Sequence, residues 1–200
     1  RSQYGHGYQI EINYANPTEE NLREIFMSIV RSSGIGTDHV NFNVEDGATI
    51  GTDDVNLTKA QVQATFRAAG KMDWDARALE GYEAQHGSGS EIYASLNNAE
   101  GVVSAKLLAT WLFFEDSFDR TCDVFNNVFG EYKIREQQIS KVRYEILSNN
   151  LNGTPRQISS LFALMEEHKA ALHVQEYSIS QTSLEQIFNQ FAATQEEEGH

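Results

Sequence analysis

Calcium binding is the chemistry that the spacing of residues 97–112, NNAEGVVSAKLLATWL, comes closest to supporting. Gly101 and Val103 occupy the sixth and eighth positions of a loop that runs into an exit helix, as in an EF-hand. Calcium also requires several carboxylates and a bidentate Glu at the twelfth position. Leu96 and Leu107 stand at the first and twelfth positions. The sequence therefore predicts no normal calcium site, and a helix pair shaped like a degenerate EF-hand stays an open alternative.

Other side chains that could hold a metal lack the required spacing. Asp73, Asp75, Glu80 and Glu83 form an acidic cluster around Trp74, and such a run is usually a solvated helix face. The six histidines show neither the His-Glu-x-x-His pattern nor paired spacing, so no zinc site is predicted. We expect no metal and no cofactor.

The sequence also argues against an enzyme. Gly70 and Lys71 lack the upstream glycine and the following hydroxyl of a P-loop, so ATP binding by that motif is not expected. A Gly-x-Ser-x-Gly nucleophile elbow is absent. Cys122 lies on an apolar helical stripe, where a buried structural thiol is the ordinary case. No catalytic residues are predicted.

Composition and net charge limit the classes of partner that the chain is expected to bind. The 200 residues carry a net charge of -14, which disfavours nucleic acid and anionic lipid as main partners because those surfaces would repel the chain. The longest apolar run, residues 107–114, is too short to cross a bilayer. The single cysteine cannot form an internal disulfide, which favours a reducing cytosolic location. Because the chain begins at Arg1, we interpret it as a piece of a longer protein.

The first half of the chain alternates between clear and weak patterns. Residues 7–14 alternate polar and apolar side chains as a half-buried strand does. Thr18 is the expected N-cap of a helix over 18–31. A long loop over 33–56, with a short strand at 39–44, should follow. The other expected elements are a helix at 58–69, a weaker helix at 74–82, an ambiguous segment at 91–96 and a buried helix at 102–114.

The last third has a more regular order. The expected elements are a helix at 118–129, strands at 132–138 and 141–147, a helix with Ile158, Leu161, Phe162 and Met165 on one side, a strand at 172–177 and a closing helix from Ser183. Thr182 and Glu185 form the expected capping box of that helix. With the middle of the chain set aside, this order predicts an α+β, ferredoxin-like βαββαβ sandwich with an extra C-terminal helix.

Two segments carry a resemblance to a known family. The opening QYGHGYQIEI and the closing EYSISQTSLEQIFNQF resemble the cytoplasmic regulatory domain that follows a nucleotide-binding domain in A-subfamily ABC transporters, the lipid-exporting branch. The closing motif agrees in type and spacing at Tyr177, Ser178, Ser180, Gln181, Leu184, Glu185 and Phe188. Asn189 and Gln190 depart from the family's usual continuation. The match covers residues 1–14 and roughly 118–195.

The resemblance implies a division of the chain. Residues 1–15 and 115–195 would form the ferredoxin-like regulatory domain, residues 16–114 an inserted, mostly helical subdomain, and residues 196–200 an acidic tail. The family has only a short connection where about one hundred residues stand in this chain. The resemblance does not explain this insertion.

The function implied by the resemblance is regulation by docking. The domain would lie at the cytoplasmic face of an integral membrane transporter, dock on a nucleotide-binding domain or a second regulatory domain, and modulate ATP-driven lipid transport. The expected interaction residues are Tyr177, Ser180, Gln181, Leu184, Ile187, Phe188 and Phe191.

Two alternatives stay open. The apolar stripe of the closing helix could pack on the domain's own sheet instead of on a partner. The insertion could form a calcium-responsive or protein-binding module built on the degenerate EF-hand-like segment.

Overall fold

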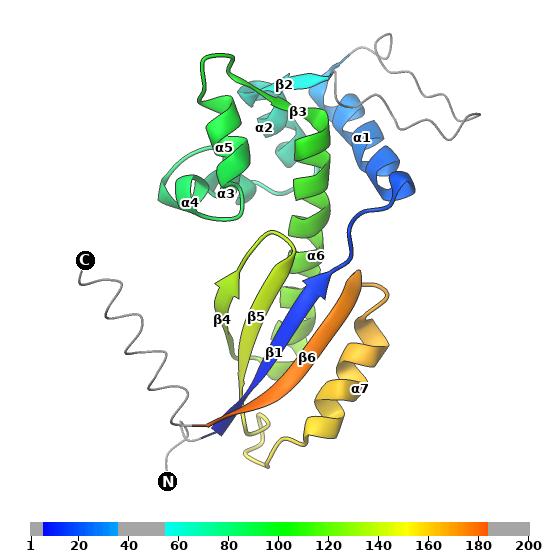
Figure 1. Cartoon of the computed structure of the whole chain (residues 1–200), viewed down its shortest axis with the longest axis vertical. Helices are drawn as coiled ribbons and strands as arrows, with labels where there is room; N and C mark the ends of the chain where they lie inside the picture. The colour runs from blue at the N-terminus through cyan, green and yellow to red at the C-terminus, as the bar shows by residue number, and fades with distance from the viewer. Residues whose placement is uncertain (1–5, 36–54, 184–200) are drawn as a thin grey trace. The chain divides into compact units, whose positions relative to one another are not determined.

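The computed structural model of the chain describes residues 6–35 and 55–183. The chain divides into two compact units. Unit 1 comprises Arg1–Ala15 and Ser117–His200, and unit 2 comprises Asn16–Asp116. Each unit contains its own sheet and its own helices (Figure 1), and helix α6 (Ala105–Phe129) contributes residues to both.

Unit 1 is built around a four-stranded antiparallel sheet. Its elements are β1 (His6–Tyr14), the C-terminal part of α6, β4 (Tyr132–Gln137), β5 (Lys141–Leu147), α7 (Ile158–His168) and β6 (Val174–Ser183). The order across the sheet is β4-β5-β1-β6, which places β6 at one edge (Figure 1). The α+β class is confirmed, and the sequence order of strand, helix, strand, strand, helix, strand is that of a split βαβ pattern. The more specific ferredoxin-like assignment stays a prediction.

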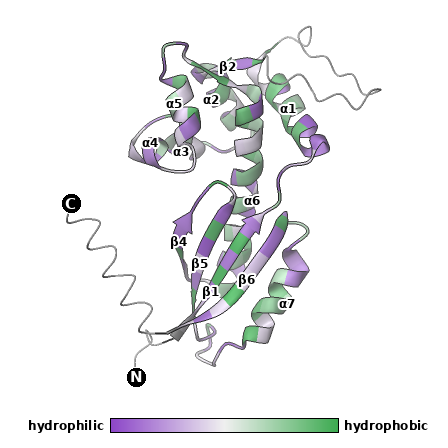
Figure 2. Cartoon of the chain, viewed as in Figure 1, coloured by the Kyte–Doolittle hydropathy of each residue, from purple (hydrophilic) through white to green (hydrophobic). Residues whose placement is uncertain are grey.

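One face of this sheet forms the core of unit 1. Ile10 and Ile12 of β1 and Val142 and Tyr144 of β5 are almost fully buried. The Phe125 ring of α6 packs edge-on against Tyr144, with 4.8 Å between ring centroids. Apolar and polar residues alternate along β1 and β5 (Figure 2), and buried positions alternate with more exposed ones from Ile10 to Tyr14 and along β5. Such alternation lets one face of a sheet pack against helices while the other face stays polar.

The opposite face carries alternating charges instead of apolar side chains. Its cross-strand ion pairs are Lys141–Glu11 (2.6 Å), Arg143–Glu136 (3.3 Å) and Arg135–Glu145. Opposite charges on neighbouring strands support the register of the sheet, with modest energies because these side chains remain partly exposed to water.

Buried hydroxyl groups in unit 1 are paired. The Tyr14 and Thr121 hydroxyls lie 2.6 Å apart, and the Thr121 hydroxyl also lies within hydrogen-bonding distance of the Ser117 carbonyl oxygen. The Tyr144 hydroxyl lies 3.5 Å from that of Tyr14. Burial raises the pKa of Tyr144 well above its usual value, because the ionised phenolate would be desolvated. These contacts tie β1, β5 and α6 to one another.

Unit 2 contains mostly helices. Its elements are α1 (Glu19–Ser33), β2 (Asn56–Thr58), α2 (Lys59–Ala68), α3 (Trp74–Ala78), α4 (Tyr82–His86), α5 (Ser90–Leu96), β3 (Val102–Ser104) and the N-terminal part of α6. Thr18 caps α1 and Thr58 caps α2, each through a capping box. The predicted N-cap at Thr18 is confirmed. β2 and β3 pair antiparallel, with Leu57 opposite Val103.

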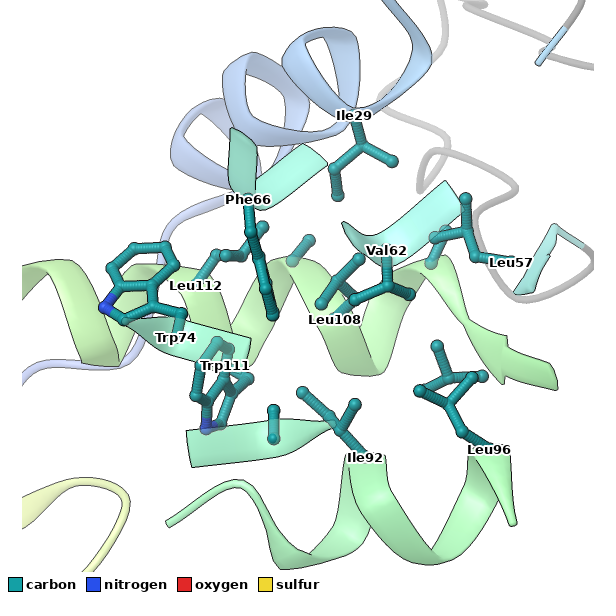
Figure 3. Packing of buried hydrophobic residues seen from close by; sticks show 14 of the residues in the cluster. Ile29, Leu57, Val62, Phe66, Trp74, Ile92, Leu96, Leu108, Trp111 and Leu112 are labelled. Atoms are coloured by element: carbon teal, nitrogen blue, oxygen red, sulfur yellow. The ribbon is translucent and has the colours of Figure 1, made fainter. Parts of the chain in front are cut away.

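Aromatic rings form the centre of unit 2. Phe66, Trp74 and Trp111 come from α2, α3 and α6, and their ring centroids lie 5.6 to 5.7 Å apart (Figure 3). Leu108 and Ile92 continue this cluster toward the β2–β3 pair. Side chains from five helices and both strands thus share one apolar core, and burial of this surface is the main stabilising contribution.

A buried ion pair adds a polar contact to this core. Glu115 is almost fully buried and accepts a hydrogen bond from Arg77 at 2.9 Å. The Ser88 hydroxyl lies 3.2 Å from the same carboxylate, and the Ser88 carbonyl accepts a hydrogen bond from the Trp111 indole. The segment between α4 and α5 is thereby fixed to α6.

Two expectations for this region are corrected. The segments at 102–114 and 118–129 are not separate helices: Val102–Ser104 forms β3, and α6 then continues without interruption because residues 105–129 contain neither Gly nor Pro. The weaker helix at 74–82 is instead two short helices. They separate at Gly81, whose φ of 97° no helical residue adopts. The ambiguous segment at 91–96 lies in α5, and the strand expected at 39–44 lies outside the described residues.

Candidate docking surface

Strand β6 lies at one edge of the unit 1 sheet and contains the first part of the predicted interaction motif. It pairs on one side with β1, from His6 opposite Ser183 to Tyr14 opposite Val174. Its other side has no neighbouring strand among the described residues. An edge strand offers backbone N–H and C=O groups to an added strand. The expected strand at 172–177 was too short, because β6 extends to Ser183 and contains residues 176–183, the first half of the closing segment.

Tyr177 fixes β6 to helix α7. It lies opposite Ile12 and therefore faces the side of the sheet covered by helices. Its hydroxyl donates a hydrogen bond to Glu166 Oε1 at 2.8 Å, and its ring centroid lies 6.1 Å from that of Phe162. Partial burial, followed by the bond to Glu166, raises the pKa of Tyr177. The hydrogen bond from Lys169, followed by the bond from Tyr177, lowers the pKa of the Glu166 carboxyl.

A shallow groove runs between α7 and β6. It has a volume of about 440 Å³ and is lined on the helix by Phe162, Glu166 and Lys169 and on the strand by Val174 and Tyr177, among others. Phe162 is 42% exposed. Of the four apolar residues expected on one side of this helix, Leu161 and Met165 are buried, whereas Ile158 is nearly as exposed as Phe162.

The other two described interaction residues, Ser180 and Gln181, are exposed. Ser180 lies opposite Gln9 on the polar face, whereas Gln181 lies opposite Tyr8, on the same face as Tyr177. The structure thus distributes the three residues over both faces of one edge strand. Leu184, Ile187, Phe188 and Phe191 lie outside the described residues.

Thr182 has a different role from the predicted capping box. It is buried in β6, and its hydroxyl donates a hydrogen bond to the Gly7 carbonyl of β1 at 3.0 Å. Ser183 is the last residue of β6. A closing helix therefore cannot begin at Ser183. Local sequence favoured a helix start here, but pairing of β6 with β1 extends the strand through these residues.

The helix face beside β6 contains functional candidates that the sequence analysis did not identify. Glu166 and Lys169 form an ion pair one turn apart and line the groove next to Tyr177. The spacing of Phe162, Glu166 and Lys169 on one helix was visible in the sequence. Their placement beside β6 follows only from the fold.

The EF-hand-like loop in unit 2 lies between α5 and β3 and is held by hydrogen bonds between its backbone and the Asn98 side chain. Asn98 Oδ1 accepts hydrogen bonds from the backbone N–H groups of Glu100 and Gly101. Leu96 is buried in the core and Leu107 packs against it, so the first and twelfth loop positions contribute to packing. Among the described residues, no group of three or more His, Cys, Asp or Glu side chains could hold a metal.

We expect calcium to leave unit 2 unchanged. Millimolar CaCl2 should alter neither the wavelength nor the intensity of Trp74 and Trp111 emission, because leucines stand where the carboxylates would be needed. Fluorescence titration, with magnesium as the ionic-strength control, measures this directly. A saturable change specific to calcium would favour the alternative of a calcium-responsive module.

Comparison with known proteins assigns part of the chain to a family. Residues 115–181 match the model of the ABCA1-like, C-terminal R1 regulatory domain. The class of protein that this match indicates is a regulatory domain. More particularly, residues 115–181 are similar to a C-terminal regulatory domain of the A-subfamily ABC transporter type, which agrees with the resemblance found in the sequence.

The individual relatives are long proteins. ATP-binding cassette sub-family A member 2 from Homo sapiens is 32% identical over 71 residues, 36% of this chain and 3% of that protein. The protein of the same name from Rattus norvegicus gives the same identity and coverage. The chain therefore spans about 3% of the length of these curated relatives. No solved structure matches. Within residues 6–35 and 55–183, no helix is long and apolar enough to cross a membrane.

Proposed function

We propose that this chain regulates an A-subfamily ABC transporter by docking through β6 and the segment that follows it. The partner is a nucleotide-binding domain or the second regulatory domain of the same transporter, at its cytoplasmic face. The observation that carries this proposal is that the first half of the closing segment, residues 176–183, lies on an exposed edge strand. The proposed parent protein is an ATP-hydrolysing lipid transporter.

The chemistry of the edge supports a protein partner. Ser178, Ser180 and Gln181 expose small or neutral polar side chains, which do not hinder the approach of another backbone. The groove beside them offers Phe162 as an apolar contact and the Glu166–Lys169 pair as polar contacts. A strand of the partner protein would form backbone hydrogen bonds with β6. Its side chains would enter the groove, and their fit there would determine which partner binds.

Docking would regulate the transporter if the docked and free states of this chain favour different arrangements of the transporter's two nucleotide-binding domains. Docking shifts that equilibrium only by its differential affinity for the two arrangements. The typical coupling between sites, about 1–3 kcal/mol, corresponds to a change of roughly 5- to 150-fold in an equilibrium.

The proposal predicts altered ATP hydrolysis in the full transporter when the edge is blocked. Ser178→Lys combined with Ser180→Lys places two charges on exposed positions of β6 and should change the steady-state ATPase rate several-fold, because charged edge strands resist pairing. Ser140→Lys is the matched control, since Ser140 is an exposed serine in the β4–β5 connection. Equal rates for the double variant, the control and the unmodified transporter would contradict a regulatory role of this edge.

A further inference from the structure

Arg156 is a buried cation close to the start of α7. The residue is only 8% exposed. Its Nε donates a hydrogen bond to the Leu147 carbonyl at 3.1 Å, and its Nη2 donates one to the Asn149 carbonyl at 3.0 Å. The guanidinium lies over the Phe129 ring, 4.7 Å from the centroid. These contacts hold the side chain in one orientation.

The charge of Arg156 has no acidic partner in the part of the chain that the structure describes. Both of its acceptors are neutral carbonyl oxygens. Burial lowers the pKa of the guanidinium, yet arginine keeps its proton in proteins. Buried charges are ordinarily paired, because desolvation of an isolated charge is costly. The hydrogens on Nη1 and one hydrogen on Nη2 are left without an acceptor among the described residues.

A pocket opens at this cation. It has a volume of about 290 Å³, and its walls include Arg156, Phe129, Leu147, Leu151, Asn149 and Asn150. Leu151 is 77% exposed, so its apolar surface in the pocket wall is accessible to a ligand. The pocket therefore combines a fixed cation, an apolar wall and amide groups, which is the general composition of a recognition site.

We propose that the Arg156 pocket binds an acidic side chain of a partner protein, a Glu or Asp that is flanked by an aliphatic residue. The carboxylate accepts hydrogen bonds from the unused guanidinium hydrogens, and the aliphatic neighbour packs on Leu147 and Leu151. Arginine is suited to this task, because its planar fork matches a carboxylate. This site is separate from the β6 groove and shares no lining residue with it.

The charge around the pocket favours a peptide over a free anion. Glu131 also lines it, and the whole chain carries a net charge of -14. Both disfavour an inorganic phosphate, which brings more negative charge and no apolar surface. A single carboxylate on a peptide brings less charge and buries aliphatic surface against Leu151. The apolar contact and the ion pair together favour the peptide.

The test uses the isotope-labelled 200-residue chain and two blocked tripeptides, acetyl-Leu-Glu-Leu-amide and its Leu-Gln-Leu analogue. The Glu peptide should shift the NMR signals of the Arg156 Nε–H and of the Leu151 and Gly153 amides, with saturation in the millimolar range. The Gln peptide should bind at least about tenfold more weakly, because it cannot form the charged pair. Added salt should lower the affinity of the Glu peptide but not that of the Gln peptide.

Two exposed positions provide variants that should leave the fold intact. Glu131→Gln should raise affinity for the Glu peptide roughly two- to fivefold by removing a repelling charge. Leu151→Ala should lower affinity roughly threefold or more by removing apolar contact. Arg156→Lys should abolish the shifts, as its point charge cannot reproduce the fork.

Three outcomes would overturn the proposal. Equal binding of both peptides would exclude a carboxylate site. If inorganic phosphate saturated the shift of the Arg156 Nε–H signal at a lower concentration than the Glu peptide does, the pocket would be a simple anion site instead. Affinities unchanged by both Glu131→Gln and Leu151→Ala would show that the peptide binds elsewhere.

Discussion

Phe66→Ala is expected to lower the free energy of unfolding of unit 2 by about 3–5 kcal/mol. Phe66 is fully buried, and its ring packs against both Trp74 and Trp111 at 5.7 Å. Truncation removes the apolar surface of the ring and leaves a cavity at the meeting point of α2, α3 and α6 (Figure 3). The expected loss is a large fraction of the stability of a small domain.

Urea denaturation followed by tryptophan emission measures this effect selectively, since both tryptophans of the chain, Trp74 and Trp111, lie in the core of unit 2. Met72→Ala is the matched control, because Met72 is 66% exposed and its truncation should change stability by about 0.5 kcal/mol or less. A loss below about 1 kcal/mol for Phe66→Ala would show that the aromatic cluster is not the centre of this core.

Tyr144→Ala should destabilise unit 1 by a similar amount, about 3–5 kcal/mol. The Tyr144 side chain is fully buried and packs against Phe125 at 4.8 Å and Tyr132 at 6.1 Å. Tyr144→Phe keeps the ring and removes only the hydroxyl, which lies 3.5 Å from that of Tyr14. This second variant should lose about 1 kcal/mol, the usual net contribution of a hydrogen bond.

Hydrogen exchange of the β1 and β5 amides separates the two Tyr144 variants, since exchange reports local opening of the sheet. Protection should fall strongly for Tyr144→Ala and only slightly for Tyr144→Phe. Equal losses would show that the hydroxyl contact stabilises the sheet more than ring packing does, contrary to the burial pattern.

The sequence predicted the elements whose side chains have a clear period. The alternation in β1 and β5 and the helical spacing in α2 and α7 gave the right elements. Thr18 also marked the start of α1 correctly, because a capping residue acts through its own local hydrogen bonds.

Elements that depend on distant partners could not be predicted. Val102–Ser104 forms a strand because Asn56–Thr58 lies opposite, and β6 reaches Ser183 because β1 pairs with it along its whole length. Thr182 looked like a helix cap, but its hydroxyl bonds to Gly7, far away in the sequence. Three-residue strands and edge strands have too little periodicity of their own to be recognised.

The sequence named candidate docking residues but could not predict their geometry. Motif residues Tyr177, Ser180 and Gln181 were named from the closing segment, and all three lie on β6. That Tyr177 bonds to Glu166 and that a groove follows α7 depends on how the helix packs beside the strand. Arg156 gave no sequence signal, since its importance comes from burial without an acidic partner among the described residues.

The most direct test of regulation by docking is the binding of this chain to the matching nucleotide-binding domains, with and without ATP. Unmodified chain, the Phe188→Ala plus Phe191→Ala variant and the Ser178→Lys plus Ser180→Lys variant would be compared by calorimetry, with circular dichroism to establish folding. We expect nucleotide-dependent binding of the unmodified chain, and both folded variants should weaken it at least about tenfold, the loss expected when central interface contacts are removed. Absence of binding in both nucleotide states, or equal binding by all three chains, would contradict regulation by docking.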